Sequence, residues 1–575
     1  MSSEDVGGQG QTESVDNPSL HLDFHFEDSP AVENDCIEPK YNTVHLKEGT
    51  RVKPETDGAK EYPEMDFRNV VDNKTIPSTD YVTHSIHKHP AVFIPQIPRH
   101  LIETFTDKTN ESGDRPLVLD PFNGSGTTGV EAKLLGRNYL GIEINPLSKL
   151  VSQVASQPIP PTVIGNIKRA FIDALANTEY DGNYDVDFMG RTQKSHWFQP
   201  DASKALTRIR RAIIEYEFKE NHLRPSLDQE YEVIENEGTT TNELRDRLQR
   251  WLVLMLANTV FDVSNADPDV SKAHKSPKMR EAIDSGEHPP DTISTFEEHL
   301  DKSHNKLTAF WNHLYNTTIP GGADQEKMAT WRRYKSESKE NSPTATTDIR
   351  LADAREFRCE EYLNSVDLAV TSPPYINAIN YYRGTKLRLF WIHDLLEDEF
   401  NNVEFRKSIV GTNSTNIPEL DRELPATIYE KWQGNEQEYR ETSLFTLDED
   451  ILAIHSSSLT NSTNRAFVTW NFFAHDMLRA LTRTYEHLKP GAHFFLFIGE
   501  NTIGGRQIAS HRHIADIAQN IGRIRGHGGK LEKDEGFDLL GFAWDEIDNR
   551  DLFQERNHTN GVIEGEWVVI LQKPL

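Results

Sequence analysis

The most regular pattern of apolar and polar residues lies in the first third of the chain. Residues 117–119 form an apolar run that predicts a strand, and a loop containing Gly124 and Gly126 follows it. Residues 128–135 predict a helix, and residues 139–144 predict a second strand. This order predicts a β-α-β unit, whose glycine loop allows a ligand to approach the backbone at the start of the helix.

A second apolar run, residues 366–370, predicts a short buried strand. It leads into the segment Thr371, Ser372, Pro373, Pro374 and Tyr375. Two prolines cannot continue the hydrogen bonding of a central strand, so the chain must leave the sheet here. Because each proline lacks an N–H but keeps its carbonyl, the turn is stiff and rich in acceptors. Beside an aromatic ring it can hold a planar base, and a turn that only ends a strand is an equal alternative.

Helical spacing dominates the long stretch between these two groups. Residues 202–216 and 244–260 carry apolar side chains at helical intervals. A compact fold needs only a short connection at this point, so we expect residues 155–345 to form a mostly helical inserted domain. Residues 1–40 are polar, acidic and without periodicity, which predicts disorder.

Composition changes this picture in one respect. The chain has 575 residues, enough for three or four domains of about 150 residues each. Its net charge is −29, whereas a nucleic-acid-binding protein is ordinarily basic. Because the acidic residues are spread along the chain, we favour a halophilic protein, which works in concentrated salt. At 1 M salt, the repulsion between charges is screened within about 3 Å. Short-range contacts must then carry more of any affinity for DNA.

Metal binding and membrane insertion have little support. Cys36 and Cys359 lie far apart without C-x-x-C spacing, and the histidines near residue 87 have no accompanying carboxylate or cysteine cluster, so no metal site is predicted. The N-terminus lacks the regions of a signal peptide, and the longest nearly continuous apolar run, residues 251–261, is shorter than the roughly 20 residues that span a bilayer. These features predict a cytoplasmic protein.

Two motifs together carry a family resemblance. The first is D-P-F-N-G-S-G-T-T with G-I-E-I-N-P, in which Glu143 lies 19 residues beyond Gly124, near the distance of about 20 at which such units place an acidic residue on ribose hydroxyls. This stretch resembles motifs I and II of the amino-directed (cytosine-N4 or adenine-N6) site-specific DNA methyltransferases, which use S-adenosyl-L-methionine. T-S-P-P-Y is similar to their catalytic motif IV.

The resemblance extends over roughly half of the chain. H-K-H-P-A-V-F is similar to motif X and residues 351–357 to motif III, which gives the order X, I, II, insert, III, IV. It implies an α/β fold with a Rossmann-like class I methyltransferase sheet and a large, mostly helical insertion. The parts after the N-terminus are then an arm with the first half of the methyltransferase domain (41–150), the insert (155–345), the part with the catalytic motif (346–394), an inserted loop region (395–465) and the C-terminal part (466–575). The position of the insert between the cofactor and catalytic halves favours a target-recognition domain, and a dimerisation or packing module is the alternative.

The resemblance also implies a set of cofactor-binding residues. Glu143 would take the ribose hydroxyls, Asp353 would lie near the adenine, and Phe93 would pack near the methionine end. The remaining residues would line the methionine and amino-acid part: Asp120, Phe122, Gly124, Gly126 and Thr127.

For catalysis, the resemblance implies that Ser372 and the Pro373 carbonyl accept hydrogen bonds from the target amine and that Tyr375, after Pro374, stacks on the base. Candidate substrate-binding residues follow in the chain: Asn377, Asn380, Tyr381, Arg406 and Lys407. For Tyr381, simple packing is an equal alternative. Basic residues of the insert, Lys204, Arg208, Arg210 and Arg211 among them, are equally compatible with phosphate contacts and with a solvated face.

Ser372 bears on the choice of base. Serine before Pro-Pro resembles cytosine-N4 enzymes more than adenine-N6 enzymes, in which Asp or Asn is commoner. Attack at C5 of cytosine needs a cysteine in a Pro-Cys context, which neither cysteine has. We therefore predict a cytosine-N4 methyltransferase acting on double-stranded DNA with a flipped base. The alternatives, in order, are an adenine-N6 enzyme, a tRNA base methyltransferase and a non-catalytic DNA-binding protein. Any restriction endonuclease would be a separate protein.

Overall fold

The computed structural model describes residues 51–55, 58–62, 80–88, 93–107, 109, 113–188, 193–268, 273–315, 345–376, 381–398, 400–401, 405, 408–411, 427–499, 501–546 and 565–575. The N-terminal segment predicted to be disordered lies outside this range. Four candidate substrate-binding residues also lie outside it: Asn377, Asn380, Arg406 and Lys407. Of a fifth, Tyr381, the backbone is described but the side chain is not.

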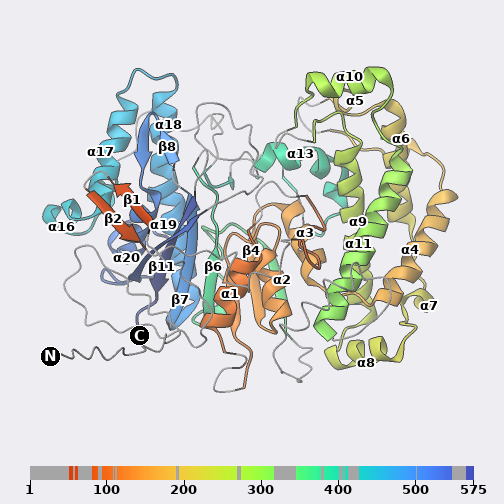
Figure 1. The fold of residues 1–575 in the computed structure, drawn as a ribbon, viewed down its shortest axis with the longest axis horizontal. Helices are drawn as coiled ribbons and strands as arrows, with labels where there is room; N and C mark the ends of the chain where they lie inside the picture. Colours follow the sequence, from red (N-terminus) through yellow and green to blue (C-terminus); the bar gives the residue numbers. More distant parts are fainter. Residues whose placement is uncertain are drawn as a thin grey trace, which may run out of the picture.

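A seven-stranded sheet forms the centre of the protein (Figure 1). Its order is β10-β11-β7-β6-β3-β4-β5. The strands from β5 to β7 pair in parallel, whereas β11 runs antiparallel between β7 and β10. Their bounds are β3 Leu117–Asp120, β4 Asn138–Glu143, β5 Thr347–Leu351, β6 Val366–Thr371, β7 Leu488–Gly499, β10 Asp538–Glu546 and β11 Gly565–Gln572. This mostly parallel sheet confirms the predicted α/β, Rossmann-like fold.

The centre of the sheet is a topological switch point. From β3 the chain passes through α2 (Thr127–Leu134) to β4 on one side, and α3 (Pro146–Ser156) follows β4. After β5 the chain returns to β6, which lies on the other side of β3 from β4. The strands β3 and β6 are parallel neighbours, but the chain continues from β3 toward one edge of the sheet and from β6 toward the other. In open parallel sheets, ligands bind beyond the carboxyl ends of the strands at such a point.

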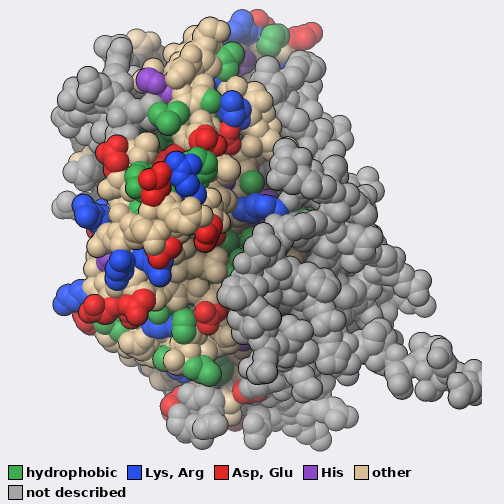
Figure 2. Space-filling model, turned by 90° about the vertical axis from the view of Figure 1, so that its left-hand side faces the viewer, with side chains coloured by type: hydrophobic (Ala, Val, Ile, Leu, Met, Phe, Trp, Pro, Cys, Tyr) green, Lys and Arg blue, Asp and Glu red, His purple; other side chains and the backbone are tan. Residues whose placement is uncertain are grey.

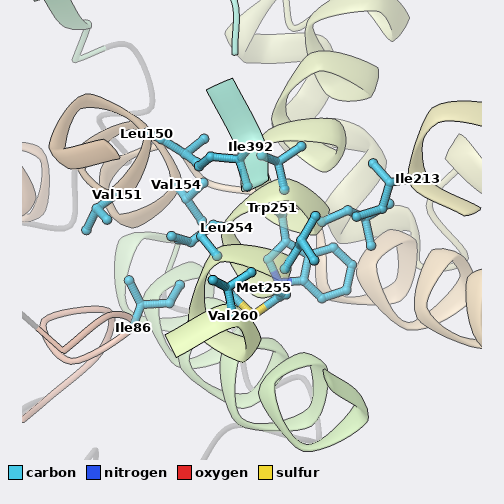
Figure 3. Packing of buried hydrophobic residues seen from close by; sticks show 14 of the residues in the cluster. Ile86, Leu150, Val151, Val154, Ile213, Trp251, Leu254, Met255, Val260 and Ile392 are labelled. Carbon is cyan, nitrogen blue, oxygen red and sulfur yellow. The ribbon is translucent and has the colours of Figure 1, made fainter. Parts of the chain in front are cut away.

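The large insertion between α3 and β5 is mostly helical, as predicted. Its long central helix, α9 (Thr241–Asp262), begins with a capping box between Thr240 and Glu243 and is buried almost completely from Trp251 to Val260. Figure 3 shows side chains of α3, α9 and α13 (Tyr381–Ile392) meeting in this core. The other helices of the insertion are α4 Pro161–Ala176, α5 Lys194–Trp197, α6 Pro200–Glu215, α7 Glu220–Leu223, α8 Asp228–Glu237, α10 Pro277–Ser285 and α11 Thr292–Tyr315.

Residues 395–465 were predicted to be a loop region, but their described part is largely helical. It contains α15 (Ile428–Lys431), α16 (Glu436–Arg440) and α17 (Ser443–His455). In α17 the buried side chains are Leu444, Leu447, Ile451 and Ile454. Their spacing is that of one helical face, and the polar residues between them obscure it in the sequence.

Helices of the C-terminal part complete the layer beside β7 and β11 (Figure 1). A helical stretch runs through α18 (Ser462–Asn471), a π-helical turn (Phe472–Met477) and α19 (Leu478–His487) directly into β7. Helix α20 (Ser510–Gln519) packs on β11. Figure 2 shows the face formed by this side of the molecule, on which acidic and basic side chains are interspersed.

The smaller elements are the hairpins β1 Arg51–Glu55 with β2 Gly58–Tyr62 and β8 Asn501–Ile503 with β9 Arg506–Ile508, the helix α1 Gln96–Phe105, and short helical turns at Gly182–Tyr184, Glu360–Tyr362, His393–Leu395 and Ile521–Arg523. Within the described part of the chain, no helix combines the length and the apolar character needed to cross a membrane.

Candidate active site

Asp120 stands at the centre of the site because it ends β3 at the switch point. Its buried carboxylate accepts hydrogen bonds from the N–H of Phe122 (3.0 Å) and from the hydroxyl of Thr128 on α2 (2.9 Å). A third hydrogen bond comes from the hydroxyl of Thr371 (2.6 Å), the last residue of β6. Asp120 therefore joins the glycine-loop half of the sheet to the strand that carries the Ser-Pro-Pro-Tyr segment.

The glycine loop fits closely between Asp120 and α3. Gly126 has a φ of 83°, and a Cβ at this position would lie 2.1 Å from Oγ of Ser152, so only glycine fits. Thr127 is the first residue of α2, and the amides and dipole at the start of a helix favour a negative group such as a carboxylate. The glycine at position 126 thus allows the loop to pack closely against α3.

Glu143 ends β4 and lies beside the same loop. Its buried carboxylate accepts hydrogen bonds from the N–H of Gly124 (2.6 Å) and from the N–H of Asn145 (2.8 Å). The next strand is held against it, because the N–H of Ala352 donates to the Glu143 carbonyl (2.9 Å). Asp353, which follows Ala352, therefore lies at the same edge of the sheet as Glu143.

The two buried carboxylates share one electrostatic property. Burial raises the pKa of Asp120 to about 6, although the hydrogen bonds from Thr371, Phe122 and Thr128 oppose the shift. Burial raises the pKa of Glu143 to about 7, against the hydrogen bonds from Asn145 and Gly124. Among the residues that the structure describes, neither forms an ion pair with a Lys or Arg. A cationic ligand would offset the cost of burying these charges.

The Ser-Pro-Pro-Tyr segment leaves the sheet directly after β6. Ser372 and Pro374 are half-buried and Pro373 is buried. The ring of Tyr375 lies against Gly499 at the end of β7, where a Cβ would come within 2.7 Å of the ring. The structure thus brings Tyr375 to the same edge of the sheet as Asp120.

The hydroxyl of Tyr375 is also held in place. It donates a hydrogen bond to Oε1 of Glu566 (2.5 Å) on β11, and Glu566 pairs with Gly499 in the register of β11 with β7. Strand β7 therefore fixes the ring of Tyr375, and strand β11 fixes its hydroxyl. Sequence reasoning missed Gly499 and Glu566, because only the pairing of β7 with β11 brings them together. Thr371 and Thr128 were missed although they stand inside the two motifs.

Two residues from the motif X region lie in different surroundings. Phe93 is half-buried and packs edge-on against Phe497 of β7, with the ring centroids 5.0 Å apart. His87 is buried, and its Nδ1 lies 2.5 Å from Oδ1 of Asn258 on α9, so it links this segment to the insertion. In the described residues, no group of three or more His, Cys, Asp or Glu is arranged to hold a metal ion.

The basic residues of α6 are mostly engaged within the chain. Arg210 is buried and binds the carboxylate of Asp394. Arg208 donates to the carbonyl of Thr178 (3.0 Å), and Arg211 pairs with Glu215 (3.0 Å). The three arginines therefore contact groups of the chain itself, and buried Arg210 does not lie on a solvated face, whereas Lys204 is exposed.

Comparison with known proteins gives a consistent result. Residues 34–152 match the DNA methylase family of N6 and N4 methyltransferases. The type II methyltransferase M.MvaI of Kocuria varians is 23% identical over 332 residues, which are 56% of this chain and 60% of the relative. M.BsoBI of Geobacillus stearothermophilus is 23% identical over 400 residues, 66% of this chain and 67% of the relative. M.HinfI of Haemophilus influenzae is 56% identical over 43 residues, 7% and 12% of the two chains.

The chain spans less than two thirds of the length of M.MvaI. Enzymes of this family use S-adenosylmethionine as the methyl donor. Residues 34–152 of the chain therefore match the N6/N4 DNA methylase family, and the chain is similar to type II methyltransferases over 56% and 66% of its length.

Proposed function

We propose that this protein transfers a methyl group from S-adenosylmethionine to the exocyclic N4 of cytosine in DNA. The observation that carries the proposal is the hydrogen bond between Thr371 and Asp120 (2.6 Å). It joins the carboxyl end of the strand before Ser372 to the carboxyl end of the strand before the glycine loop. A donor bound at the loop and an acceptor bound at Ser372 would therefore be adjacent, as a direct transfer requires.

The cofactor site would be formed by the carboxyl ends of β3, β4 and β5. S-adenosylmethionine would supply a methyl group activated by a positively charged sulfonium. Asp120 fits the cationic part of such a ligand because it is a buried carboxylate without a cationic partner among the described residues, and the buried carboxylate of Glu143 offers acceptors for hydroxyl groups. In the proposed arrangement Glu143 takes the ribose hydroxyls, and Asp353 lies near the adenine. The methionine part is held by Phe93, Asp120, Phe122, Gly124, Gly126 and Thr127.

The chain's contribution to catalysis would be positioning and preorganised electrostatics. An exocyclic amine is a poor nucleophile because its lone pair is delocalised into the ring. The hydroxyl of Ser372 and the carbonyl of Pro373 would accept hydrogen bonds from its two N–H groups and so favour a more pyramidal nitrogen. The base must leave the duplex, and stacking on Tyr375 compensates for part of the lost stacking energy.

The insertion would contribute to target recognition by supporting the helix that follows the catalytic segment. Helix α13 packs on α9 of the insertion. Arg210 on α6 and Arg250 on α9 also bind carboxylates just beyond α13, those of Asp394 and Glu397. In this proposal the neighbouring residues Asn377, Asn380, Tyr381, Arg406 and Lys407 contact the base or the DNA.

One experiment tests the activity and the choice of base together. The protein is incubated with methyl-labelled S-adenosylmethionine and DNA, and the DNA is digested to nucleosides. Labelled N4-methylcytosine supports the proposal, and labelled N6-methyladenine replaces it with the adenine-N6 alternative. Label in tRNA but not in DNA would refute both DNA activities. Cofactor binding without transfer to any nucleic acid would indicate a binding protein.

The dispersed negative charge leads to a related proposal, that the protein works in concentrated salt. The net charge of −29 causes self-repulsion that salt screens. Thermal unfolding is measured in KCl at about 0.1 M and at about 2 M, where the Debye length falls from about 10 Å to below about 3 Å. We expect a clearly higher melting temperature at the higher concentration, and an unchanged one would refute the adaptation.

A further inference from the structure

Arg355 joins three segments that are far apart in the sequence. Its Nε donates to Oδ1 of Asp353 (2.9 Å), and its Nη2 donates to Oδ2 of the same carboxylate (2.5 Å). Its Nη1 donates to Oδ1 of Asp476 (2.8 Å), and Nη2 also donates to the carbonyl of Ser408 (3.1 Å). Although burial opposes the charge, the carboxylates of Asp353 and Asp476 raise the pKa of Arg355 above its ordinary value.

Asp476 occupies an unusual place in the backbone. It lies in the π-helical turn Phe472–Met477 between α18 and α19, and its side chain is 3% exposed. It also accepts a hydrogen bond from the side-chain amide of Asn471 (3.0 Å). A π-helical turn holds an extra residue compared with a regular α-helical turn, and such turns are frequent at functional sites. Here the turn directs a buried carboxylate at Arg355.

The third contact reaches the catalytic segment. Residues 408–411 include buried Ile409 and Val410 and end at Gly411, whose φ is 68°. A Cβ at Gly411 would lie 3.1 Å from the carbonyl oxygen of Tyr375 and 3.6 Å from that of Pro374. The short segment that Arg355 holds through Ser408 therefore packs directly against the backbone of the Ser-Pro-Pro-Tyr segment.

We propose that Arg355 is a positioning residue that couples the cofactor-binding loop after β5 to the catalytic segment. Its hydrogen bonds to Asp353 connect it to the part of the site that would hold the adenine. Its hydrogen bond to the Ser408 carbonyl holds residues 408–411 against Tyr375. This coupling rests on the proposed function, because that function assigns the cofactor to Asp353 and the target base to Tyr375.

The chemistry of arginine suits this role. A planar guanidinium presents five donors in a rigid fork, so it can hold two carboxylates and a carbonyl at once, and a shift of one partner changes the geometry of the others. Lysine keeps the charge as a single point and cannot bridge the three groups in this way. By reciprocity, a cofactor that stabilises the Asp353 loop also stabilises residues 408–411.

The test uses hydrogen–deuterium exchange on the full chain with S-adenosylmethionine alone, so it requires no knowledge of the DNA sequence. In the wild type we expect the cofactor to slow amide exchange in residues 408–411 and at Tyr375 by at least about fivefold, the lower end of typical coupling between sites. In Arg355→Lys the cofactor still binds in calorimetry, but the slowing at residues 408–411 disappears. Asp476→Asn, which keeps the volume of the side chain, should weaken the slowing in the same direction.

The matched control is Arg358→Lys in the same loop. Arg358 pairs with the exposed Glu360 and with Glu486, away from the catalytic segment. This variant should retain the full cofactor-dependent slowing. If Arg355→Lys and Asp476→Asn fold, bind the cofactor and keep the slowing, the coupling is wrong and Arg355 is only structural. If the wild type does not bind the cofactor at all, the proposed function fails first and the coupling with it.

Discussion

Two regions with buried carboxylates differ in their surroundings: Glu131 on helix α2 has cationic partners, whereas Asp120 and Glu143 at the ends of β3 and β4 have neutral donors. Glu131, on α2, accepts hydrogen bonds from the hydroxyl of Tyr81 (2.5 Å) and from Arg99 on α1 (3.1 Å), and Nε2 of His84 lies 2.6 Å away. Burial raises its pKa, but the contacts with His84 and Arg99 outweigh burial, so the pKa of Glu131 lies below its ordinary value. Asp120 and Glu143 are also buried, yet their pKa values are raised.

The difference separates a carboxylate that is paired within the protein from the two carboxylates that we propose to contact the cofactor. Glu131 ties the segment around residue 81 and helix α1 to α2 with its own cationic partner, so it completes a structural contact. Asp120 and Glu143 have only neutral donors around them in the described structure. Buried charges are normally paired, so two buried carboxylates with neutral donors at a switch point support the proposed cofactor site. Four predictions test this comparison.

The largest effect is expected from Glu131→Gln. The substitution removes the buried charge that pairs with Arg99 and should lower the free energy of unfolding by about 3 kcal/mol, as breaking a buried ion pair does. The matched control is Glu103→Gln, which removes the half-exposed partner of the same arginine and should cost no more than about 1 kcal/mol. Denaturant unfolding measures both. Equal effects of the two substitutions would contradict the structural role of Glu131.

Asp120→Asn should behave in the opposite way. The Thr128 hydroxyl can rotate and accept from the new amide, so the hydrogen bonds of the site survive and stability changes little. The loss of the charge should weaken binding of S-adenosylmethionine by about 10- to 100-fold, the value of a hydrogen bond to a charged group. Calorimetry and thermal unfolding give the two readouts. A loss of stability as large as that of Glu131→Gln would remove the distinction between the two regions.

The raised pKa values of Asp120 and Glu143 predict how the stability of the protein and its affinity for the cofactor change with pH. Asp120 and Glu143 keep their protons to about pH 6 and about pH 7 in the folded chain, above the values of about 4 in the unfolded chain. Their contribution to stability is therefore fully present below pH 4 and is lost as the pH rises through 6 and 7. A cationic cofactor prefers the ionised groups, so its binding should strengthen over the same range.

Thermal unfolding with and without S-adenosylmethionine measures this dependence. The rise in melting temperature caused by the cofactor should be small near pH 5.5 and several degrees larger near pH 8, because each group weakens binding by up to about tenfold per pH unit below its pKa. In Asp120→Asn the part of the dependence near pH 6 should disappear. A cofactor effect that is constant over this range would contradict the raised pKa values.

The smallest effect is expected from the hydroxyl of Tyr375. Tyr81 and Tyr375 each donate to a glutamate at 2.5 Å, but Glu131 is fully buried and Glu566 is not. Tyr81→Phe should therefore destabilise the protein by about 1–3 kcal/mol, whereas Tyr375→Phe should cost less than about 1 kcal/mol.

Tyr375→Phe keeps the ring and should reduce methyl transfer only a few-fold, whereas Tyr375→Ala should abolish it and spare cofactor binding. Transfer that survives in Tyr375→Ala would refute the stacking role.

Local sequence patterns determined much of the architecture. The strand, glycine loop and helix around Gly124 and Gly126 follow from backbone preferences and short apolar runs, and the structure has them within one or two residues of the predicted bounds. The helical character of the insertion follows from spacing within single helices. Such features depend on residues that are neighbours along the chain, so a single sequence contains them. The roles of the candidate site residues remain predictions.

Only the tertiary structure decided which charges are paired. The sequence offered Arg210 as a candidate for phosphate contact, but the packing of α6 buries it against Asp394. It offered no sign that Glu566 would meet Tyr375, that Arg355 would bridge three segments or that Glu131, unlike Asp120, would have a cationic partner. These contacts join residues up to 191 positions apart, and strand register and helix packing set them. Local sequence patterns determine the elements, whereas the packing of these elements determines which buried charges have a cationic partner.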